Sequence, residues 1–267
     1  MSRWLRSFAV VALIALTLAY VSAEELTVLH FNDFHGNLLI PDEGKPGGIA
    51  RIATVEQQVR EANEARGADT LMLVAGDVLQ GTPMSTVFRG EPDFKCLNIL
   101  PVDAMCLGNH EFDYGMPNLH RLIDMADFPL LSANIRRKLD DTQVFPGVVT
   151  RTVGGEKVVI IGLTTPETNV TTMPSNVANI EFLDPVEVAR TLCRRIMGQG
   201  DHLIIALTHL GYEEDLKLAA AVPDLDVIVG GHSHTLIEQP GIVGNTIVVT
   251  AEAYGKWVGQ LDLDVEG

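Results

Sequence analysis

The sequence is short of positive charge. Its 267 residues contain 19 lysines and arginines against 35 aspartates and glutamates, which gives a formal net charge of −16 at pH 7. A chain this acidic repels polyanions, so it is not expected to bind nucleic acid polymers through a basic surface. If the protein handles phosphate, the positive charge that binds it has to come from bound cations rather than from lysine and arginine.

Long hydrophobic runs are also missing, apart from one at the N-terminus. Phe8–Val21 is apolar over about 14 residues, which is short of the roughly 20 needed to cross a bilayer. Arg3 and Arg6 precede this run and the small residues Val21-Ser22-Ala23 end it, a pattern typical of a secretory signal peptide at residues 1–23. The alternative is a membrane anchor. We expect a secreted mature chain, periplasmic or extracellular, without a transmembrane segment.

Cysteine is scarce, and no CxxC pair suggests a thiolate metal site or a redox motif. The number of cysteines is odd, so in an oxidising compartment at least one stays free or pairs between chains. Cys106 lies in an apolar run and is predicted to be a buried thiol. A disulfide between Cys96 and Cys106 or between Cys96 and Cys193 is possible, and the sequence does not choose between them. Asn169-Val170-Thr171 is a sequon for N-glycosylation, which applies only in a eukaryotic host.

The pattern of apolar runs predicts a single α/β domain at residues 24–267. A hydrophobic fraction of 46% is enough for a core. Strands that are apolar without alternation, separated by helices, indicate a sheet buried on both faces. Helices are predicted at Ile49–Arg66, Met84–Arg89, Phe94–Leu100, Leu119–Ala126 and Pro185–Met197. Strands or extended segments are predicted at Leu26–Phe31, Leu71–Ala75, Ala104–Leu107, Pro129–Ala133, Val158–Leu163, Leu203–Leu207, Val227–Val229, Thr246–Thr250 and Trp257–Val265.

Polar side chains follow five of these strands directly. Each of the five strands leads into a group of Asp, Asn or His flanked by glycine, and five of the eight histidines lie in these groups. Ligands bind in the crevice at the carboxyl ends of the strands of an open α/β sheet, so we expect the groups to meet at one edge of one sheet. The groups are Asn32-Asp33-Phe34-His35-Gly36, Gly76-Asp77, Gly108-Asn109-His110-Glu111-Phe112-Asp113, Thr208-His209-Leu210-Gly211 and Gly230-Gly231-His232-Ser233-His234.

The spacing and the types of these residues indicate bound metal ions. Asp33 and His35 are two positions apart, as are His232 and His234, so in an extended segment both side chains of a pair point to the same side. Carboxylate, amide and imidazole without thiolate suit zinc, manganese, iron or cobalt. Seven candidate ligands are too many for one tetrahedral site but fit two sites that share a carboxylate. Two ions about 3.5–4 Å apart clamp the attacking and leaving oxygens of a phosphoryl displacement.

In order and in type, the five groups resemble the signature of the calcineurin-like metallophosphoesterases. The surrounding residues His30–Gly36, Gly76–Thr82 and Gly108–Gly115 narrow the resemblance to the N-terminal catalytic domain of the secreted 5'-nucleotidase family, which includes periplasmic UDP-sugar hydrolases. The resemblance covers nearly all of residues 25–267. It implies a four-layer α/β sandwich of two mixed sheets flanked by helices, and it implies hydrolysis of a small phosphate ester, a nucleoside 5'-phosphate.

The resemblance also implies a role for each matching residue. One metal ion would be held by Asp33, His35, Asp77 and His234, and the other by Asp77, Asn109, His209 and His232, with Asp77 as the bridge. His110 and Asp113 match a catalytic dyad, in which His110 stabilises the transition state or assists the leaving group and Asp113 orients its imidazole. Asn109 and His110 would contact the substrate. A metal-bound hydroxide would be the nucleophile, since coordination lowers the pKa of water.

Two departures from the family bear on these expectations. Some relatives carry Gln or Asn where this chain has His234, so its metal preference is expected to differ from theirs. The family's C-terminal domain provides aromatic stacking for the base and arginines for the phosphate. The sequence ends at Gly267, near where the catalytic domain should end, so we expect either a piece of a longer protein or a standalone catalytic domain. Hydrolysis of nucleoside 5'-phosphates is therefore the first of several predicted activities. The alternatives to it are hydrolysis of nucleotide sugars, of 2',3'-cyclic nucleotides or of sulfur compounds, and nucleotide binding with little turnover.

Other residues near the five groups are expected to be mainly structural. Glu111 is expected to satisfy hydrogen bonds rather than act as a base, and His30 to be packed within its strand. Tyr254 and Trp257 are expected to pack in the core or at an edge, with a base-stacking platform as the alternative. Contact with substrate stays open for Asn32, Gln80 and Thr82.

Overall fold

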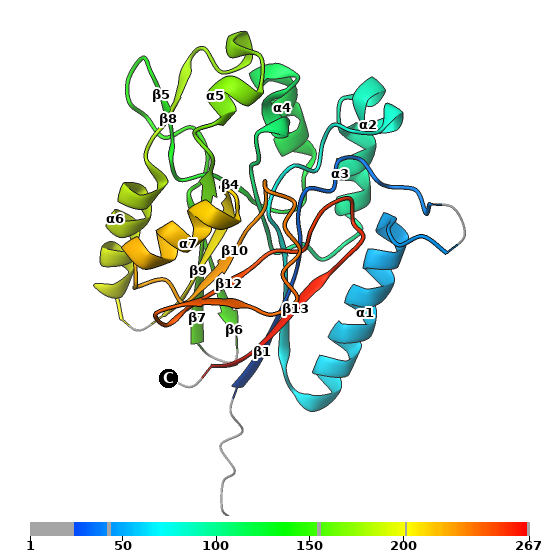
Figure 1. The fold of residues 1–267 in the computed structure, drawn as a ribbon, viewed down its shortest axis with the longest axis vertical. Helices are drawn as coiled ribbons and strands as arrows, with labels where there is room; N and C mark the ends of the chain where they lie inside the picture. Colours follow the sequence, from blue (N-terminus) through cyan, green and yellow to red (C-terminus); the bar gives the residue numbers. More distant parts are fainter. Residues whose placement is uncertain (1–23, 42–43, 154–155, 201, 266–267) are drawn as a thin grey trace, which may run out of the picture.

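The computed structural model describes residues 24–41, 44–153, 156–200 and 202–265. The predicted signal peptide at residues 1–23 lies outside the described residues. Two β-sheets stack face to face in the described part of the chain, and helices cover the outer face of each sheet (Figure 1).

The first sheet is mixed, with β13 at one edge. Strands β1, β2, β3 and β4 are parallel neighbours in that order, and β13 pairs antiparallel with β1. The strands are β1 (Glu24–Phe31), β2 (Asp69–Val74), β3 (Ala104–Cys106), β4 (Leu130–Leu131) and β13 (Gly259–Val265). Because β1, β2 and β3 are parallel, the segments that follow them leave the sheet at the same end.

The second sheet is also mixed, in the order β11-β12-β10-β9-β7-β6. Strands β12, β10, β9 and β7 are parallel, and β11 and β6 pair antiparallel at the two edges. The strands are β6 (Val148–Val153), β7 (Glu156–Thr164), β9 (Leu203–His209), β10 (Val227–Val229), β11 (Gly241–Val243) and β12 (Thr246–Val249). A separate two-stranded sheet consists of β5 (Ile135–Arg137) and β8 (Ile180–Phe182).

Helices form the two outer layers. Helices α1, α3 and α4 pack against the first sheet and share one hydrophobic cluster with it, while α6 and α7 share another cluster with the second sheet (Figure 1). The helices are α1 (Ile49–Arg66), α2 (Pro83–Phe88), α3 (Glu91–Leu97), α4 (Gly115–Met125), α5 (Thr168–Thr171), α6 (Pro185–Met197) and α7 (Tyr212–Ala221). Single 3-10 turns lie at η1 (His110–Phe112) and η2 (Pro174–Asn176).

The strands are apolar on both faces because each sheet packs between two layers. In β1, Leu26 and Val28 belong to the cluster between the sheets, whereas Leu29 and Phe31 pack with the helices. Alternate residues thus face opposite layers although the run is uniformly apolar. The four-layer sandwich of two mixed sheets is confirmed. The expectation of one sheet, drawn from the strand pattern, is wrong. A strand that is buried on both faces has the same apolar sequence whether the domain contains one sheet or two stacked sheets.

Helices α1 and α6 begin and end at the predicted residues. In α6 the side chain of Asp184 accepts a hydrogen bond from the N–H of Val186, Pro185 lies in the first turn, and Ala189 and Cys193 lie on the buried face. Helix α7 and the edge strands β6 and β11 were not predicted. The first turn of α7 carries three acidic residues, and the edge strands are only partly buried, so neither shows a clear apolar period.

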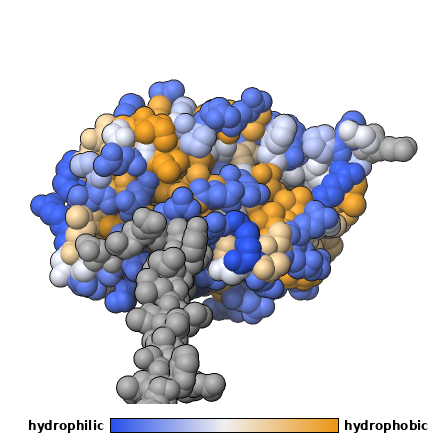
Figure 2. Space-filling view, turned by 90° about the horizontal axis from the view of Figure 1, so that it is seen from below, coloured by the Kyte–Doolittle hydropathy of each residue, from blue (hydrophilic) through white to orange (hydrophobic). Residues whose placement is uncertain are grey.

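No helix in the described part of the chain is long and apolar enough to cross a membrane. Figure 2 shows the molecule from below the view of Figure 1, with hydrophilic and hydrophobic residues intermixed on this face. Cys96, Cys106 and Cys193, all within the described ranges, are free thiols, and the predicted burial of Cys106 is confirmed.

Candidate functional site

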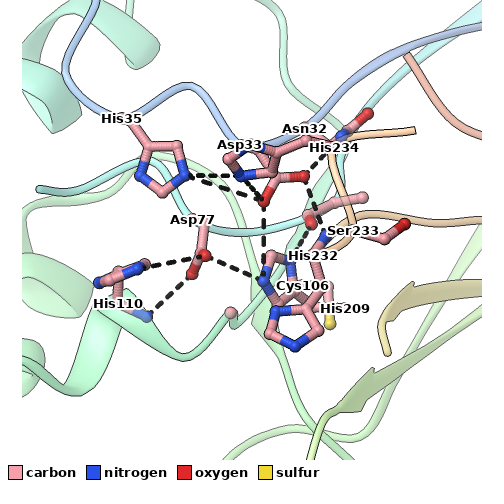
Figure 3. Close-up of polar contacts among 12 residues, drawn as sticks. Asn32, Asp33, His35, Asp77, Cys106, His110, His209, His232, Ser233 and His234 are labelled. Carbon is pink, nitrogen blue, oxygen red and sulfur yellow. Dashed lines mark hydrogen bonds and ion pairs between the residues drawn. The ribbon is translucent and has the colours of Figure 1, made fainter. Parts of the chain in front are cut away.

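The predicted ligands meet at the edge where the carboxyl ends of both sheets lie. Strands β1, β2 and β3 of the first sheet and β9 and β10 of the second end here. Figure 3 shows carboxylates and imidazoles from these five segments pointing toward one another. His209 is the last residue of β9, and the other ligands lie in the segments that follow their strands. The predicted convergence is confirmed, but it joins two sheets rather than one.

Asp33, His35 and His234 form the first group of possible ligands, with ligand atoms within 4.8 Å of one another. Oδ1 of Asp33 is 3.3 Å from Nε2 of His234 and 3.9 Å from Nε2 of His35. The two imidazole nitrogens are 3.1 Å apart. A carboxylate oxygen and two imidazole nitrogens around one point make a donor set for a divalent transition metal.

Asp77, His209 and His232 form the second group, again with ligand atoms within 4.8 Å of one another. Oδ2 of Asp77 is 3.1 Å from Nε2 of His209. Asp77 also belongs to a third group with His35 and His110, so its carboxylate lies between the first group and the second. This is where a bridging ligand would have to be. Asn109 lines the same pocket.

Buried polar atoms test whether metal ions fit these groups. Several buried side-chain atoms of the described residues lack a hydrogen-bond partner, and Oδ1 of Asp33, Oδ1 of Asn109 and Nε2 of His209 are the ones that lie at this site. Buried polar atoms in native proteins are almost always paired. All three of these atoms belong to predicted ligands, and coordination to a cation would satisfy each of them. The residues present therefore fit a metal centre.

The charges at the site favour a cation as well. Burial lowers the pKa of His209, but the carboxylates of Asp77 and Asp33 outweigh it and raise that pKa to about 10. Burial raises the pKa of Asp77, yet the neighbouring histidines, His209 above all, hold it well below its usual range. These two shifts favour an ionised carboxylate on Asp77 and a positive charge on His209, side by side in a buried place. A metal ion would take the place of the proton on His209.

The backbone of the site is bent rather than extended. Asp33, His35, Asp77, His232 and His234 all have positive φ, between 48° and 80°. Residues other than glycine rarely adopt this left-handed conformation, and those that do concentrate at functional sites. The prediction that each pair shares a side because its segment is extended is wrong. Asp33 and His35 do face one site, but His232 and His234 belong to different groups.

Asn32 holds the carboxylate of Asp33 in place. Its Nδ2 donates to Oδ2 of Asp33 at 2.6 Å, and its Oδ1 accepts from the backbone N–H of Ala251 at 2.9 Å. The side chain is fully buried. Substrate contact, which the sequence left open, is therefore not accessible to Asn32.

Glu111 fixes the loop that carries Asp77. Its carboxylate accepts hydrogen bonds from the backbone N–H groups of Asp77, Val78 and Gly108 at 2.7–2.9 Å and from that of Leu79 at 3.4 Å. The predicted structural role of Glu111 is confirmed. Burial and then the charge of Asp77 raise the pKa of Glu111 to about 7. Position 108 next to the Asp77 carboxylate requires glycine, because a Cβ at Gly108 would lie 2.3 Å from Oδ1 of Asp77.

His110 and Asp113 form a hydrogen-bonded pair beside the predicted metal ligands. Nδ1 of His110 lies 2.6 Å from Oδ2 of Asp113, and Nε2 of His110 is 3.9 Å from Oδ2 of Asp77. Burial lowers the pKa of His110, but the hydrogen bond to Asp113 and the charge of Asp77 outweigh it and raise that pKa to about 9. The hydrogen bond to Asp113 thus favours the charged form of the imidazole, and the side chain of His110 lines the pocket.

The site opens into a pocket of about 580 Å³, a volume that suits a small molecule. Gln80, Thr171 and Tyr254 line it together with five of the seven predicted ligands, whereas Asp33 and His209 are fully buried beneath it. The ring centre of Tyr254 is 5.6 Å from that of His35 and 5.3 Å from that of His234, and the side chain is 40% exposed. Tyr254 therefore packs at the edge of the site and not in the core. A larger groove of about 970 Å³ lies beside α6, lined by other residues.

Sequence comparison identifies the family. The family model described as calcineurin-like phosphoesterase matches residues 26–236. The chain is 36% identical over 270 residues to a 5'-nucleotidase of Vibrio vulnificus (strain CMCP6) and 38% identical over 270 residues to the snake venom 5'-nucleotidase of Crotalus adamanteus. These alignments cover 90% of this chain but 49% and 45% of the two relatives. The chain therefore spans about half the length of the curated relatives it matches.

Solved structures agree with this result. The structure of a 5'-nucleotidase precursor from Thermus thermophilus matches with a TM-score of 0.78 at 37% identity. The match covers 91% of this chain and 52% of the chain in that structure. The calcineurin-like phosphoesterase YfkN from Bacillus subtilis has a TM-score of 0.82 at 28% identity, with 91% and 86% covered. The family uses divalent metals, for which this chain has candidate ligand groups. The chain belongs to the calcineurin-like phosphoesterase family.

Proposed function

We propose that residues 24–267 are the catalytic domain of a secreted, metal-dependent hydrolase that removes the phosphate from nucleoside 5'-phosphates. The observation that carries the proposal is the set of three ligand groups linked to one another through His35 and Asp77. Two divalent ions would be held there, one by Asp33, His35, Asp77 and His234 and the other by Asp77, Asn109, His209 and His232. Zinc, manganese, iron and cobalt are the candidates. When bound, such ions lower the pKa of coordinated water and neutralise charge on the phosphoryl group.

Residues of the chain itself would orient the substrate and provide a proton. Asp113 accepts a hydrogen bond from Nδ1 of His110, which leaves the proton on Nε2 to face the pocket. From there it can be donated to a phosphoryl oxygen or to the leaving oxygen. Asn109 and His110 both line the pocket and are the proposed substrate contacts. The exposed ring of Tyr254 adds an apolar wall beside His35.

The nucleotide is proposed from the relatives. Several are named 5'-nucleotidases, and the structure described as NAD nucleotidase of Haemophilus influenzae has a TM-score of 0.79 at 30% identity. A net charge of −16 fits a protein that binds a small phosphate ester through cations rather than a nucleic acid polymer through a basic surface. The pattern at residues 1–23 supports secretion.

Initial rates on AMP, UDP-glucose and 2',3'-cyclic AMP with added Mn²⁺ test the proposal. We expect AMP to be hydrolysed fastest, and His110→Ala to lower kcat by about 10²–10⁴-fold, the range for loss of a general acid. Turnover of an aryl phosphate but of none of the nucleotides would refute the substrate. Absence of hydrolysis of any phosphate ester would refute the enzyme.

A further inference from the structure

A sixth strand also brings a polar side chain to the site. Strand β7 is the parallel neighbour of β9, and its last residue Thr164 is paired with His209. The segment that follows β7 carries Glu167, immediately before the short helix α5. Oε2 of Glu167 lies 3.1 Å from Nε2 of His232. The sequence pattern does not single out this carboxylate, because no glycine or second polar ligand stands beside it.

We infer that Glu167 is a positioning residue that fixes the imidazole of His232 for metal binding, an inference that rests on the proposed function. An imidazole that binds a metal through one ring nitrogen ordinarily donates the N–H of the other to a carboxylate or a carbonyl. With Nε2 of His232 engaged by Glu167, Nδ1 is the nitrogen left for the ion shared with Asp77. Glu167 thereby selects the tautomer that has its proton on Nε2 and a free electron pair on Nδ1.

Two other ligand histidines divide their nitrogens in the same way. Nδ1 of His209 lies 2.7 Å from the carbonyl oxygen of Ala75, and its buried Nε2 faces Oδ2 of Asp77 at 3.1 Å. Nδ1 of His35 lies 3.3 Å from the carbonyl oxygen of Leu79, and its Nε2 faces the site. In each ring, one nitrogen meets an oxygen acceptor and the other is directed at the proposed ion. For His232 that acceptor is the carboxylate of Glu167.

The backbone holds Glu167 firmly beside the second sheet. The N–H of Thr165 donates to the carbonyl oxygen of His209 at 3.0 Å, and the N–H of Glu167 donates to Oγ1 of Thr165 at 3.2 Å. The N–H of Thr171 donates to the carbonyl oxygen of Glu167 at 3.0 Å. The Glu167 side chain is 68% exposed, so its charge is screened by water and its effect comes from the direction of the hydrogen bond.

Titration of the metal-free protein with Mn²⁺, followed by calorimetry, tests the inference. We expect Glu167→Ala to weaken binding at one of two sites by about ten- to a hundredfold, the effect of losing such an outer hydrogen bond. Glu167→Gln keeps an oxygen acceptor and is expected to recover most of the affinity. Glu181→Gln, a substitution of an exposed glutamate on β8, serves as the control and is expected to bind Mn²⁺ as the wild type does.

The tautomer of His232 gives a readout independent of metal and of activity. In ¹⁵N-histidine NMR spectra of the metal-free protein, we expect the wild type and Glu167→Gln to carry the His232 proton on Nε2, and Glu167→Ala to show a mixture. If Glu167→Ala binds Mn²⁺ within twofold of the wild type and keeps the tautomer, the inference is overturned. Wild-type protein that binds two Mn²⁺ ions but hydrolyses no nucleotide would overturn the proposed function and leave the role of Glu167 standing.

Discussion

Replacing Glu111 by glutamine removes a buried charge without changing the shape of the side chain. In the wild-type protein, the Glu111 carboxylate accepts hydrogen bonds from the backbone N–H groups of Asp77, Val78 and Gly108. The amide offers only one oxygen, and its NH₂ group would face N–H donors in place of the second oxygen. Oε2 accepts the shorter pair of hydrogen bonds, from Asp77 and Gly108, so the amide oxygen is expected to take its place. The NH₂ group then faces the N–H groups of Val78 and Leu79, which are left without an acceptor.

We expect Glu111→Gln to lower the free energy of unfolding by about 3 kcal/mol at pH 8, because each buried unsatisfied N–H costs about 1–3 kcal/mol. Relief of the buried charge offsets part of the loss: burial and Asp77 raise the pKa of Glu111 to about 7, so the carboxylate is ionised at pH 8. Urea unfolding of the metal-free protein, followed by circular dichroism, measures the change.

The exposed glutamate on β8 again gives a matched control. Glu181→Gln is expected to change the free energy of unfolding by no more than about 0.5 kcal/mol. A change below about 1 kcal/mol for Glu111→Gln, with an unaltered dependence on urea, would show that the N–H groups find other acceptors and would refute the reasoning.

Three further predictions concern pH dependence and the pocket. Burial lowers the pKa of His30 to about 4, so the unfolded chain takes up this proton first and stability falls as the pH drops from about 6.5 to 4. The urea midpoint of His30→Leu is expected to fall less over this pH range than that of the wild type. Equal falls in the two proteins would show that His30 does not cause the loss of stability. Asp113→Asn is expected to move the alkaline limb of the AMP rate profile to lower pH, because Asp113 helps to raise the pKa of His110 to about 9 and the charged ring is the active form. An unmoved limb would argue against the dyad. Tyr254→Ala is expected to raise KM for AMP several-fold with kcat nearly unchanged, since the ring lines the pocket beside His35. A loss confined to kcat would point to a different role.

Much of the fold could be predicted because local signals were strong. Ile49–Arg66 and Pro185–Met197 have the observed helix bounds, and Val227–Val229 has the observed strand bounds. The division into two sheets could not be read from the residues, because Leu26–Phe31 and Leu203–Leu207 are equally apolar on both faces. It came from the family resemblance. Tyr212–Ala221 was missed, since a helix of this length with an acidic first turn shows little amphipathic period.

The site was more predictable in its members than in its geometry. Glycine-flanked Asp, Asn and His after apolar strands marked the seven predicted ligands, and the structure brings their segments together. The left-handed backbone at His35 and His234 could not be predicted, because only a small minority of histidines adopt it and no local pattern marks these two. Glu167 was missed because it reaches His232 across 65 positions of sequence, and only the pairing of β7 with β9 makes them neighbours.

The central claim is that two metal ions lie on either side of Asp77. Anomalous scattering from crystals of the protein grown with Mn²⁺ tests it most directly. We expect two peaks about 3.5–4 Å apart, the separation of two-metal hydrolytic sites. One peak should contact Asp33, His35 and His234, and the other Asn109, His209 and His232, with the Asp77 carboxylate between them. A single peak, or peaks away from Asp77, would contradict the account.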